Sequence, residues 1–298
     1  MDITNSIINY RRFLKRRNYS AHTIRNYMNM LKHFVVWLDV PLEKATHTKV
    51  IEYIDWLLGK RLKPKTINCH LACISGFYQY LHYEQDIEVT NPVKRGYSLR
   101  MPKPLPRCLR DEAIDMLFDV LKTRRDRAMF MLMLRCGLRV EEIANLRLSA
   151  IDLRRRQIMV HNGKGGKDRV VYISNDAHKA LVDYIKVRPA CKAKKVFLVE
   201  KGPCRGKPIS VRGIQKRMEY YAGKTGLKIS CHQLRHTMAT QMLNADAELS
   251  TIQDLLGHNW VTTTERYCKV SNLKVKRDYY KAMEAVMQRT AVGKAASD

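Results

Sequence analysis

The sequence predicts a mainly α-helical protein with one small β-sheet, arranged as two domains. Apolar residues recur at helical spacing along most of the 298 residues, and the spacing typical of strands appears mainly at one hairpin. A proline-containing stretch without apolar periodicity separates an all-helical beginning from the rest. With 45% hydrophobic residues, a chain of this length is sufficient for two cores.

Residues 1–88 are predicted to form a four-helix domain. Ser20 fits the N-cap of a second helix, and a third helix is expected after Thr48. Pro64 suits the first turn of the fourth helix, because proline has no backbone N–H to lose there. Each of the four segments has apolar residues at helical spacing, so we expect them to pack as a small bundle.

Residues 89–106 are predicted to be a linker. Four prolines interrupt this stretch, which also contains Lys94, Arg95 and Arg100. Proline density favours an extended chain. We therefore expect a basic linker between the two domains that can run along a polyanion.

Residues 107–290 are predicted to form the second domain, and residues 291–298 a disordered tail. Helical spacing appears in 112–121, 126–136, 140–146, 176–187 and 211–224. Two short strands, 157–161 and 169–173, flank a turn that contains three glycines.

The charge of the chain predicts a polyanionic partner. The chain has 55 Lys and Arg against 28 Asp and Glu, a formal net charge of +27. Residues 1–100 contain 16 Lys and Arg against 8 Asp and Glu, and the remaining residues contain 39 against 20. Both domains are therefore expected to contact the polyanion. Double-stranded DNA is the leading candidate. An anionic membrane surface is the alternative, but we find no segregated basic amphipathic helix and no run that could span a bilayer.

Exposed basic positions of the first domain, the linker and the hairpin are the candidate DNA contacts. Clusters at a helix end and at a helix start suit phosphate binding. The candidates are Arg11, Arg12, Lys15, Arg16, Arg17, Arg25, Lys63, Lys65, Lys94, Arg95, Arg100, Lys167 and Arg169.

The eight cysteines indicate neither disulfides nor a metal site. They are scattered, and no Cys/His set has the spacing of a zinc site. The N-terminus has no signal-peptide pattern. We expect a cytoplasmic protein with reduced thiols, associated with the bacterial nucleoid and needing no metal or other cofactor.

The candidate chemistry is concentrated in five short stretches of the second domain. Gly257 fits the position after a helix that ends at Leu256, and His258 follows that turn. Tyr267 lies nine residues further on, and a phenol is a poor nucleophile unless cations surround it. His232 and Arg235 are three residues apart, on one face of a helix.

The remaining candidates precede these residues. Arg139 follows the glycine that ends a helix, and Glu142, three residues on, is placed to hold or orient it. Lys164 lies in the glycine-containing turn of the hairpin, where a long side chain can reach into a groove. Together these residues supply several cations, an imidazole and a phenol.

These motifs resemble those of the tyrosine recombinases of the phage-integrase class, with the layout of the Xer recombinases. Gly-Leu-Arg139-x-x-Glu142, the Gly-Lys164-Gly turn, His232-x-Leu-Arg235-His and Leu-Gly-His258 before Tyr267 stand in the family's order. The resemblance covers nearly the whole chain. It implies a SAM-like core-binding domain and a catalytic domain that form a C-shaped clamp on DNA.

The resemblance also implies roles for these residues. Arg139 and Arg235 would bind the non-bridging oxygens of a DNA phosphate, and Tyr267 would attack it to form a 3′-phosphotyrosine. Lys164 would protonate the 5′-oxygen. The supporting groups would be His232 for proton transfer, His258 as a hydrogen-bond donor to the phosphate, and Glu142 to hold Arg139 and His232. Strand exchange through a Holliday junction would need no ATP and would serve integration and excision, inversion or resolution of DNA.

Several alternatives stay open at this stage. Lys167 in the same turn is a rival for Lys164 as the acid, and Tyr279 and Tyr280 are rivals for Tyr267. The helix expected over 275–289 packs either on its own domain or in a neighbouring protomer of a homotetramer, as the resemblance implies. A second recombinase or a directionality factor could also take part.

Two other functions are consistent with parts of the pattern. One is a DNA-binding protein that has kept the fold and lost catalysis, although such a protein would be expected to lack one of the arginines or the tyrosine. The other is a monomeric type IB topoisomerase, which uses the same phosphotyrosine chemistry. The small helical first domain and the helix after Tyr267 favour the recombinase.

Overall fold

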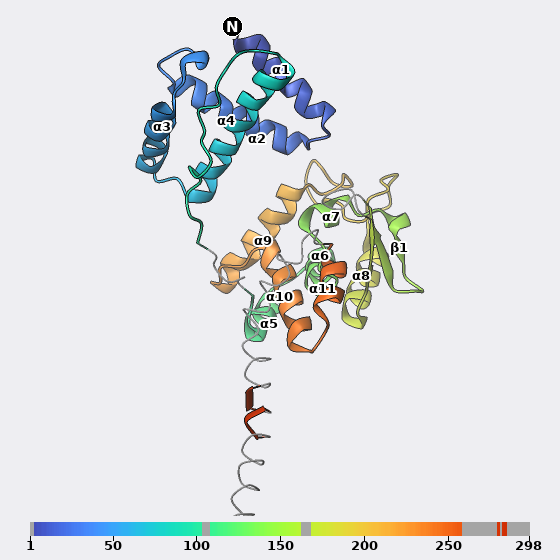
Figure 1. The fold of residues 1–298 in the computed structure, drawn as a ribbon. Coiled ribbons are helices and arrows are strands. Elements are labelled where there is room, and N and C mark those ends of the chain that lie inside the picture. Colours follow the sequence, from blue (N-terminus) through green and yellow to red (C-terminus); the bar gives the residue numbers. More distant parts are fainter. Residues whose placement is uncertain (1–2, 103–107, 162–167, 258–278, 281, 285–298) are drawn as a thin grey trace, which may run out of the picture. The chain divides into compact units, whose positions relative to one another are not determined.

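The computed structural model of the chain describes residues 3–102, 108–161, 168–257, 279–280 and 282–284. The chain forms two compact units, Met1–Lys103 and Pro104–Asp298. The described residues are mostly helical, with a single three-stranded sheet in the second unit (Figure 1). The predicted fold class, mainly α with a small β-sheet, is confirmed.

The first unit is the predicted helix bundle. Its helices are α1 (Ile3–Arg16), α2 (Ala21–Trp37), α3 (His47–Gly59) and α4 (Pro64–Glu84), with a 3-10 turn at Leu42–Lys44. Ser20 caps α2 as predicted, because its hydroxyl oxygen accepts the Thr23 N–H. The third helix begins at His47 rather than after Thr48, because Thr46 caps it in the same way.

The predicted linker is attached to this bundle over most of its described length. Val89 is buried in the bundle core, and Val93, Tyr97 and Leu99 pack against that core. Asn68 on α4 fixes Leu99 from both sides: its Oδ1 accepts the Leu99 N–H at 2.8 Å, and its Nδ2 donates to the Leu99 carbonyl at 2.9 Å. The chain is thus held to the bundle as far as Leu99, and the role of residues 89–106 as a linker between the domains stays a prediction.

The second unit contains the remaining described elements. Its main helices are α5 (Asp111–Asp119), α6 (Arg124–Arg135), α7 (Val140–Asn145), α8 (Asn175–Val187), α9 (Val211–Thr225), α10 (Cys231–Asn244) and α11 (Leu249–Leu256), with a 3-10 turn at Leu148–Ala150. The strands are β1 (Ile151–Asp152), β2 (Gln157–Val160) and β3 (Arg169–Tyr172), in the order β1-β2-β3. Both pairings are antiparallel, with Ile158 opposite Ile151 and Val171.

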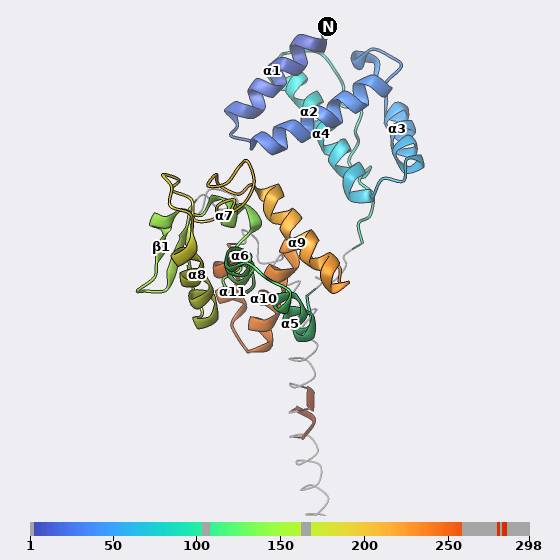
Figure 2. The same ribbon diagram turned by 180° about the vertical axis from the view of Figure 1, so that it is seen from behind.

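Helix α6 lies in the middle of this unit, with α8 and the sheet on one side and α9 on the other (Figures 1 and 2). It packs against α8 and α10, and its residues from Ala128 to Leu134 are all buried. Among the described residues, no helix is long and apolar enough to cross a membrane. The C-terminal end of α6 leads directly to Arg139, so the core fixes the approach to that arginine.

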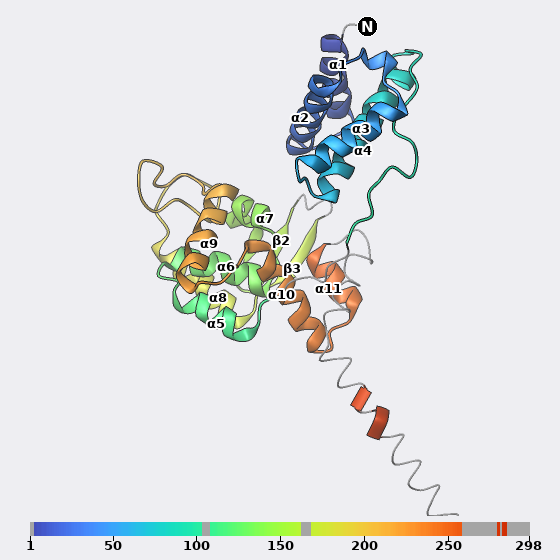
Figure 3. The same cartoon turned by 90° about the vertical axis from the view of Figure 1, so that its left-hand side faces the viewer.

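Gly137 allows helix α11 to pack closely against this end of α6. Its φ is +64°, and a Cβ at this position would lie 2.9 Å from Cδ2 of Leu256 and 3.2 Å from Sδ of Met238. A Cβ this close would require the Leu256 side chain to shift, and the positive φ strains any residue that carries a side chain, so the position favours glycine. Helix α11 in turn contacts β3, as Figure 3 shows.

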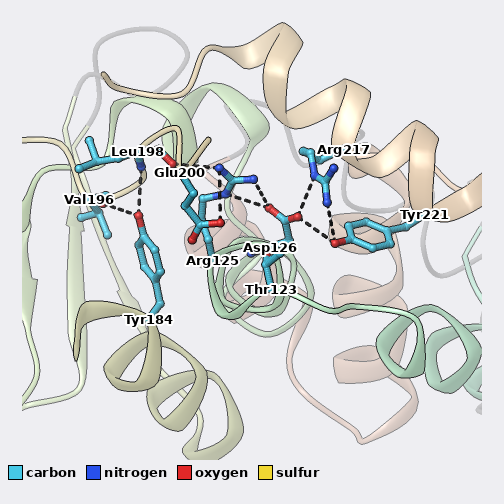
Figure 4. Close-up of polar contacts among 9 residues, drawn as sticks. All are labelled: Thr123, Arg125, Asp126, Tyr184, Val196, Leu198, Glu200, Arg217 and Tyr221. Carbon is cyan, nitrogen blue, oxygen red and sulfur yellow. Dashed lines mark hydrogen bonds and ion pairs between the residues drawn. The ribbon is translucent and has the colours of Figure 1, made fainter. Parts of the chain in front are cut away.

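A buried carboxylate fixes the other end of α6. Asp126 is fully buried, and its Oδ1 accepts from Arg125 while its Oδ2 accepts from Arg217 and Tyr221 of α9 (Figure 4). Arg125 also donates to the Leu198 carbonyl at 3.0 Å. Two guanidinium groups and a phenol therefore satisfy one carboxylate, and they join α6 to α9 and to the segment near residue 198.

Replacing Asp126 with alanine is expected to destabilise the second unit by about 3–5 kcal/mol, since Arg217 would lose its carboxylate partner and the buried Arg125 would keep only the longer ion pair with Glu200. Tyr221→Phe, which removes the hydrogen bond to Asp126 and the one from Arg217, should cost about 2 kcal/mol. Scanning calorimetry measures both. The transition of the helix bundle, which has its own core, serves as the internal control. An unchanged transition of the second unit in Asp126→Ala would contradict the structural role of this network.

Candidate functional site

Arg139 begins helix α7 and is held by Glu142 in the first turn of the same helix. The Glu142 carboxylate accepts the backbone N–H of Arg139 at 2.7 Å through Oε2 and its Nη1 at 2.8 Å through Oε1. A glutamate at the third helical position is well placed to satisfy the free N–H of the N-cap residue. The predicted support of Arg139 by Glu142 is thus present in the structure.

Arg235 is almost completely buried on helix α10. Its guanidinium donates through Nη1 to the carbonyl oxygen of Gly137 and through Nη2 to that of Leu256. These carbonyls lie at the C-terminal ends of α6 and α11, where a carbonyl oxygen has no N–H partner within its own helix. Arg235 therefore joins the ends of two helices that are far apart in sequence.

Arg169 is not the DNA contact that the sequence predicted. Its side chain is only 8% exposed, and its two terminal nitrogens donate to the two oxygens of Glu142, each at 2.8 Å. Its Nε donates to the carbonyl of Leu255 at 2.8 Å. A buried guanidinium with these partners is not available to a surface phosphate, so the prediction for Arg169 is wrong.

Three arginines from three elements converge on the last carbonyls of α11. Arg169 of β3 donates to the carbonyl of Leu255, and Arg235 of α10 donates to the carbonyl of Leu256. Arg139 donates from its Nη2 to the carbonyl of Gly257 at 3.1 Å. The C-terminus of a helix carries a partial negative charge and favours cations. Gly257 has φ +58° and ends the helix as predicted.

The Glu142 carboxylate remains ionised among these arginines. Burial by itself would raise its pKa, but the hydrogen bonds and positive charges of Arg169 and Arg139 more than offset that effect and hold the pKa at about 2. Glu142 is therefore a fixed negative charge shared by two guanidinium groups.

His232 lies one helical turn before Arg235 and faces the same cations. The residue is exposed to solvent, yet the surrounding protein partly desolvates the imidazole, and the charges of Arg235 and Arg139 add to this effect. All three factors lower the pKa of His232 below its ordinary value. A neutral imidazole able to accept a proton is the expected form at pH 7. Its neighbour His236 makes an edge-to-face ring contact with it at 4.3 Å.

Four predicted site residues lie outside the described residues: Lys164, Lys167, His258 and Tyr267. Most of the helix predicted over 275–289 lies outside them too. Of the rival tyrosines, Tyr279 is 58% and Tyr280 56% exposed. Within the described part of the chain, the predicted residues brought together are Arg139, Glu142, His232 and Arg235, with Arg169 in addition.

The described candidates for DNA contacts in the first unit and the linker are all exposed to solvent. These are Arg11, Arg12, Lys15, Arg16, Arg17, Arg25, Lys63, Lys65, Lys94, Arg95 and Arg100. Exposure is required of a phosphate contact, and the role itself stays a prediction.

Arg169 has a place in the site that the sequence analysis missed, although the sequence holds a signal for it. Successive strand residues point to opposite faces of a sheet. Arg169 therefore shares a face with Val171 and Ile173, both of which are buried. An arginine on the buried face of a strand needs a buried counter-charge, and this requirement could have suggested Glu142.

Comparison with known proteins agrees with this arrangement. The model of the phage integrase family matches residues 107–274, and the model of the phage integrase N-terminal SAM-like domain matches residues 7–85. The tyrosine recombinase XerC of Thermodesulfovibrio yellowstonii is 33% identical over 262 residues, which cover 84% of this chain and 86% of that protein.

Solved structures show the same fold at lower identity. A lambda integrase dimer bound to a COC′ core site is 19% identical, with a TM-score of 0.74 over 90% of this chain and 95% of that one. The XerH site-specific recombinase in its post-cleavage complex with palindromic difH is also 19% identical, with a TM-score of 0.72 over 88% of this chain and 80% of that one.

The matched family models, the identity with XerC and the paired site arginines lead to one conclusion: the chain belongs to the phage integrase family of site-specific tyrosine recombinases, enzymes that cut and rejoin DNA.

Proposed function

We propose that this recombinase carries out strand exchange with Arg139, Lys164, His232, Arg235, His258 and Tyr267 around a single DNA phosphate. The observation that carries the proposal is the convergence of Arg139 and Arg235 on the end of α11, with His232 close enough for both charges to act on it. From that end, the chain continues directly into His258 and reaches Tyr267 nine residues later.

The two arginines suit the charge that develops in the reaction. Attack on a phosphodiester builds negative charge on the non-bridging oxygens, and guanidinium groups match that planar, two-oxygen geometry. Preorganised donors in a partly buried site are worth more than the same donors in water. Arg139 and Arg235 bind these oxygens, and His258 donates a further hydrogen bond.

Bond making and breaking balance without ATP. The phenol oxygen of Tyr267 forms a bond to phosphorus while the bond from phosphorus to the 5′-oxygen breaks. His232 accepts the phenol proton, and Lys164 gives a proton to the 5′-oxygen. The resulting 3′-phosphotyrosine is again a phosphodiester, so the 5′-hydroxyl of a partner strand can reverse the step and generate a Holliday junction.

The positive charge of the chain supports DNA binding, and the solved structures of related recombinases support assembly on DNA. The exposed cations of the helix bundle bind phosphates of the duplex, and both domains contact the DNA. The lambda integrase and XerH structures are complexes with DNA sites, which supports a multimer on DNA here. The active assembly is a tetramer on two recombination sites in the cytoplasm, joined by exchange of the segment 275–289.

The nucleophile is tested with nicked duplexes from the DNA that flanks the gene, in which loss of a short fragment traps the covalent intermediate. The wild type should form a protease-sensitive protein–DNA adduct, and Tyr267→Phe should form none, because it lacks the attacking oxygen. Tyr279→Phe and Tyr280→Phe are the controls and should still form the adduct, because both keep the phenol of Tyr267. An adduct that persists in Tyr267→Phe would reject the proposed nucleophile.

The acid is tested by replacing the 5′-oxygen with sulfur. A thiol is far more acidic than an alcohol, with a pKa of about 8.5, so a thiolate leaves without protonation. Lys164→Ala should cleave the ordinary substrate about 100-fold or more slowly than the wild type. On the sulfur substrate it should match the wild type. Lys167→Ala should be close to wild type on both, and the reverse pattern would assign the acid to Lys167.

The state of His232 is tested by NMR titration of its imidazole in the DNA-free protein. The wild-type pKa should lie below the ordinary 6.5, so the neutral, proton-accepting form persists to lower pH. Arg139→Met removes a nearby positive charge, and the pKa of His232 should rise. The exposed Arg155, changed to glutamine, is the control and should leave it unchanged. A wild-type pKa above 6.5 would argue against His232 as the base.

A further inference from the structure

Arg169 has no part in the mechanism proposed above, although it is buried in direct contact with Glu142 of that site. Its neighbours in the strand explain why it faces inward but not why the position holds a cation. A buried cation costs solvation free energy, so its partners indicate what it does.

We propose that Arg169 is a positioning residue that shares the Glu142 carboxylate, so that Glu142 orients Arg139 without neutralising its charge. This inference rests on the proposed function, in which Arg139 binds the DNA phosphate.

The hydrogen bonds of the Glu142 carboxylate support this difference between the roles of Arg169 and Arg139. Arg169 binds Glu142 with both terminal nitrogens, one on each oxygen, at 2.8 Å. Arg139 donates a single side-chain N–H to Oε1 and turns its other terminal nitrogen to the neutral carbonyl of Gly257. The two-pronged ion pair thus belongs to Arg169, and Arg139 is tethered at one nitrogen.

The charges lead to the same conclusion. Arg139, Arg169 and Arg235 supply three positive charges and Glu142 one negative charge, which leaves a net charge of two (3 − 1 = 2). Without Arg169, Glu142 would pair with Arg139 alone. Its negative charge would then weaken the potential at Arg139 and repel an incoming phosphate, and in a partly buried site this repulsion is only weakly screened.

A second contact ties Arg169 to the end of α11. Its Nε binds the Leu255 carbonyl, and its side chain lies on the backbone of Gly257. A Cβ at position 257 would be 3.0 Å from Cδ and 3.2 Å from Nη1 of Arg169. Gly257 therefore leaves room for the Arg169 side chain. Through these contacts Arg169 binds the Glu142 carboxylate and also holds the turn at the end of α11.

The test combines two substitutions in the full-length protein and measures single-turnover cleavage at saturating protein on the nicked substrates. Arg169→Met should lower the cleavage rate about 100-fold. Its affinity for the same DNA should stay within about threefold, because Arg169 is not a DNA contact. Adding Glu142→Gln to Arg169→Met removes the unshared negative charge and should raise the rate about tenfold above that of the single variant. A merely structural role would not produce this recovery.

Two further variants complete the design. Arg155→Gln, an exposed arginine of the same sheet region, should cleave like the wild type, and Arg169→Lys should fall between the wild type and Arg169→Met, since it keeps the charge without the two-pronged geometry. If Arg169→Met does not fold, the comparison is made between Arg169→Lys and its Glu142→Gln double variant.

A double variant as slow as the single variant, or slower, would overturn the inference. So would a loss confined to DNA affinity. If the wild type itself forms no adduct, the proposed function falls and the inference with it, whereas an active wild type with an equally active Arg169→Met removes the inference alone.

Discussion

The arrangement of the site depends on how the last turn of helix α11 is capped. The final carbonyls of a helix lack partners within the helix and carry partial negative charge. Here the carbonyls of Leu255, Leu256 and Gly257 accept from three different guanidinium groups. Those groups come from β3, α10 and the start of α7, so one helix end fixes three elements of the domain relative to one another.

The same bonds satisfy the arginines. Arg235 is 2% exposed, and a buried guanidinium without partners would cost several kcal/mol. The end of α6 supplies the Gly137 carbonyl and the end of α11 supplies that of Leu256. Gly137 makes this possible, because a side chain there would collide with Leu256. Helix ends and arginines therefore stabilise each other, and Arg235 has a structural role in addition to its proposed role with phosphate.

The sequence predicted the elements whose signals are local. The cap at Ser20, the proline that opens α4 and the glycine that ends α11 each act within one turn of chain, and each appears at its predicted position. The family motifs likewise identified Arg139 and Arg235, which the fold brings to one place.

The features that were missed depend on partners distant in sequence. Strand β1 has only two residues and exists through pairing with β2, and the attachment of residues 89–99 to the bundle includes a bond between Leu99 and Asn68, 31 residues earlier. Arg169 was assigned to DNA together with the other basic positions of the hairpin. Its inward direction follows from the strand register, and its partner Glu142 lies 27 residues earlier in the chain.

The choice of partners also explains how the arginines can stay reactive toward phosphate. A carboxylate bound to both terminal nitrogens of an arginine cancels its charge and competes with phosphate for the same two-pronged geometry. Both terminal nitrogens of Arg235 and the second nitrogen of Arg139 donate to backbone carbonyls, which are neutral dipoles. Such partners fix the direction of a guanidinium and leave its full positive charge. Among the residues that the structure describes, the carboxylate in contact with Arg139 is that of Glu142, which is shared with Arg169, so the positive potential needed by a developing phosphorane persists before DNA arrives.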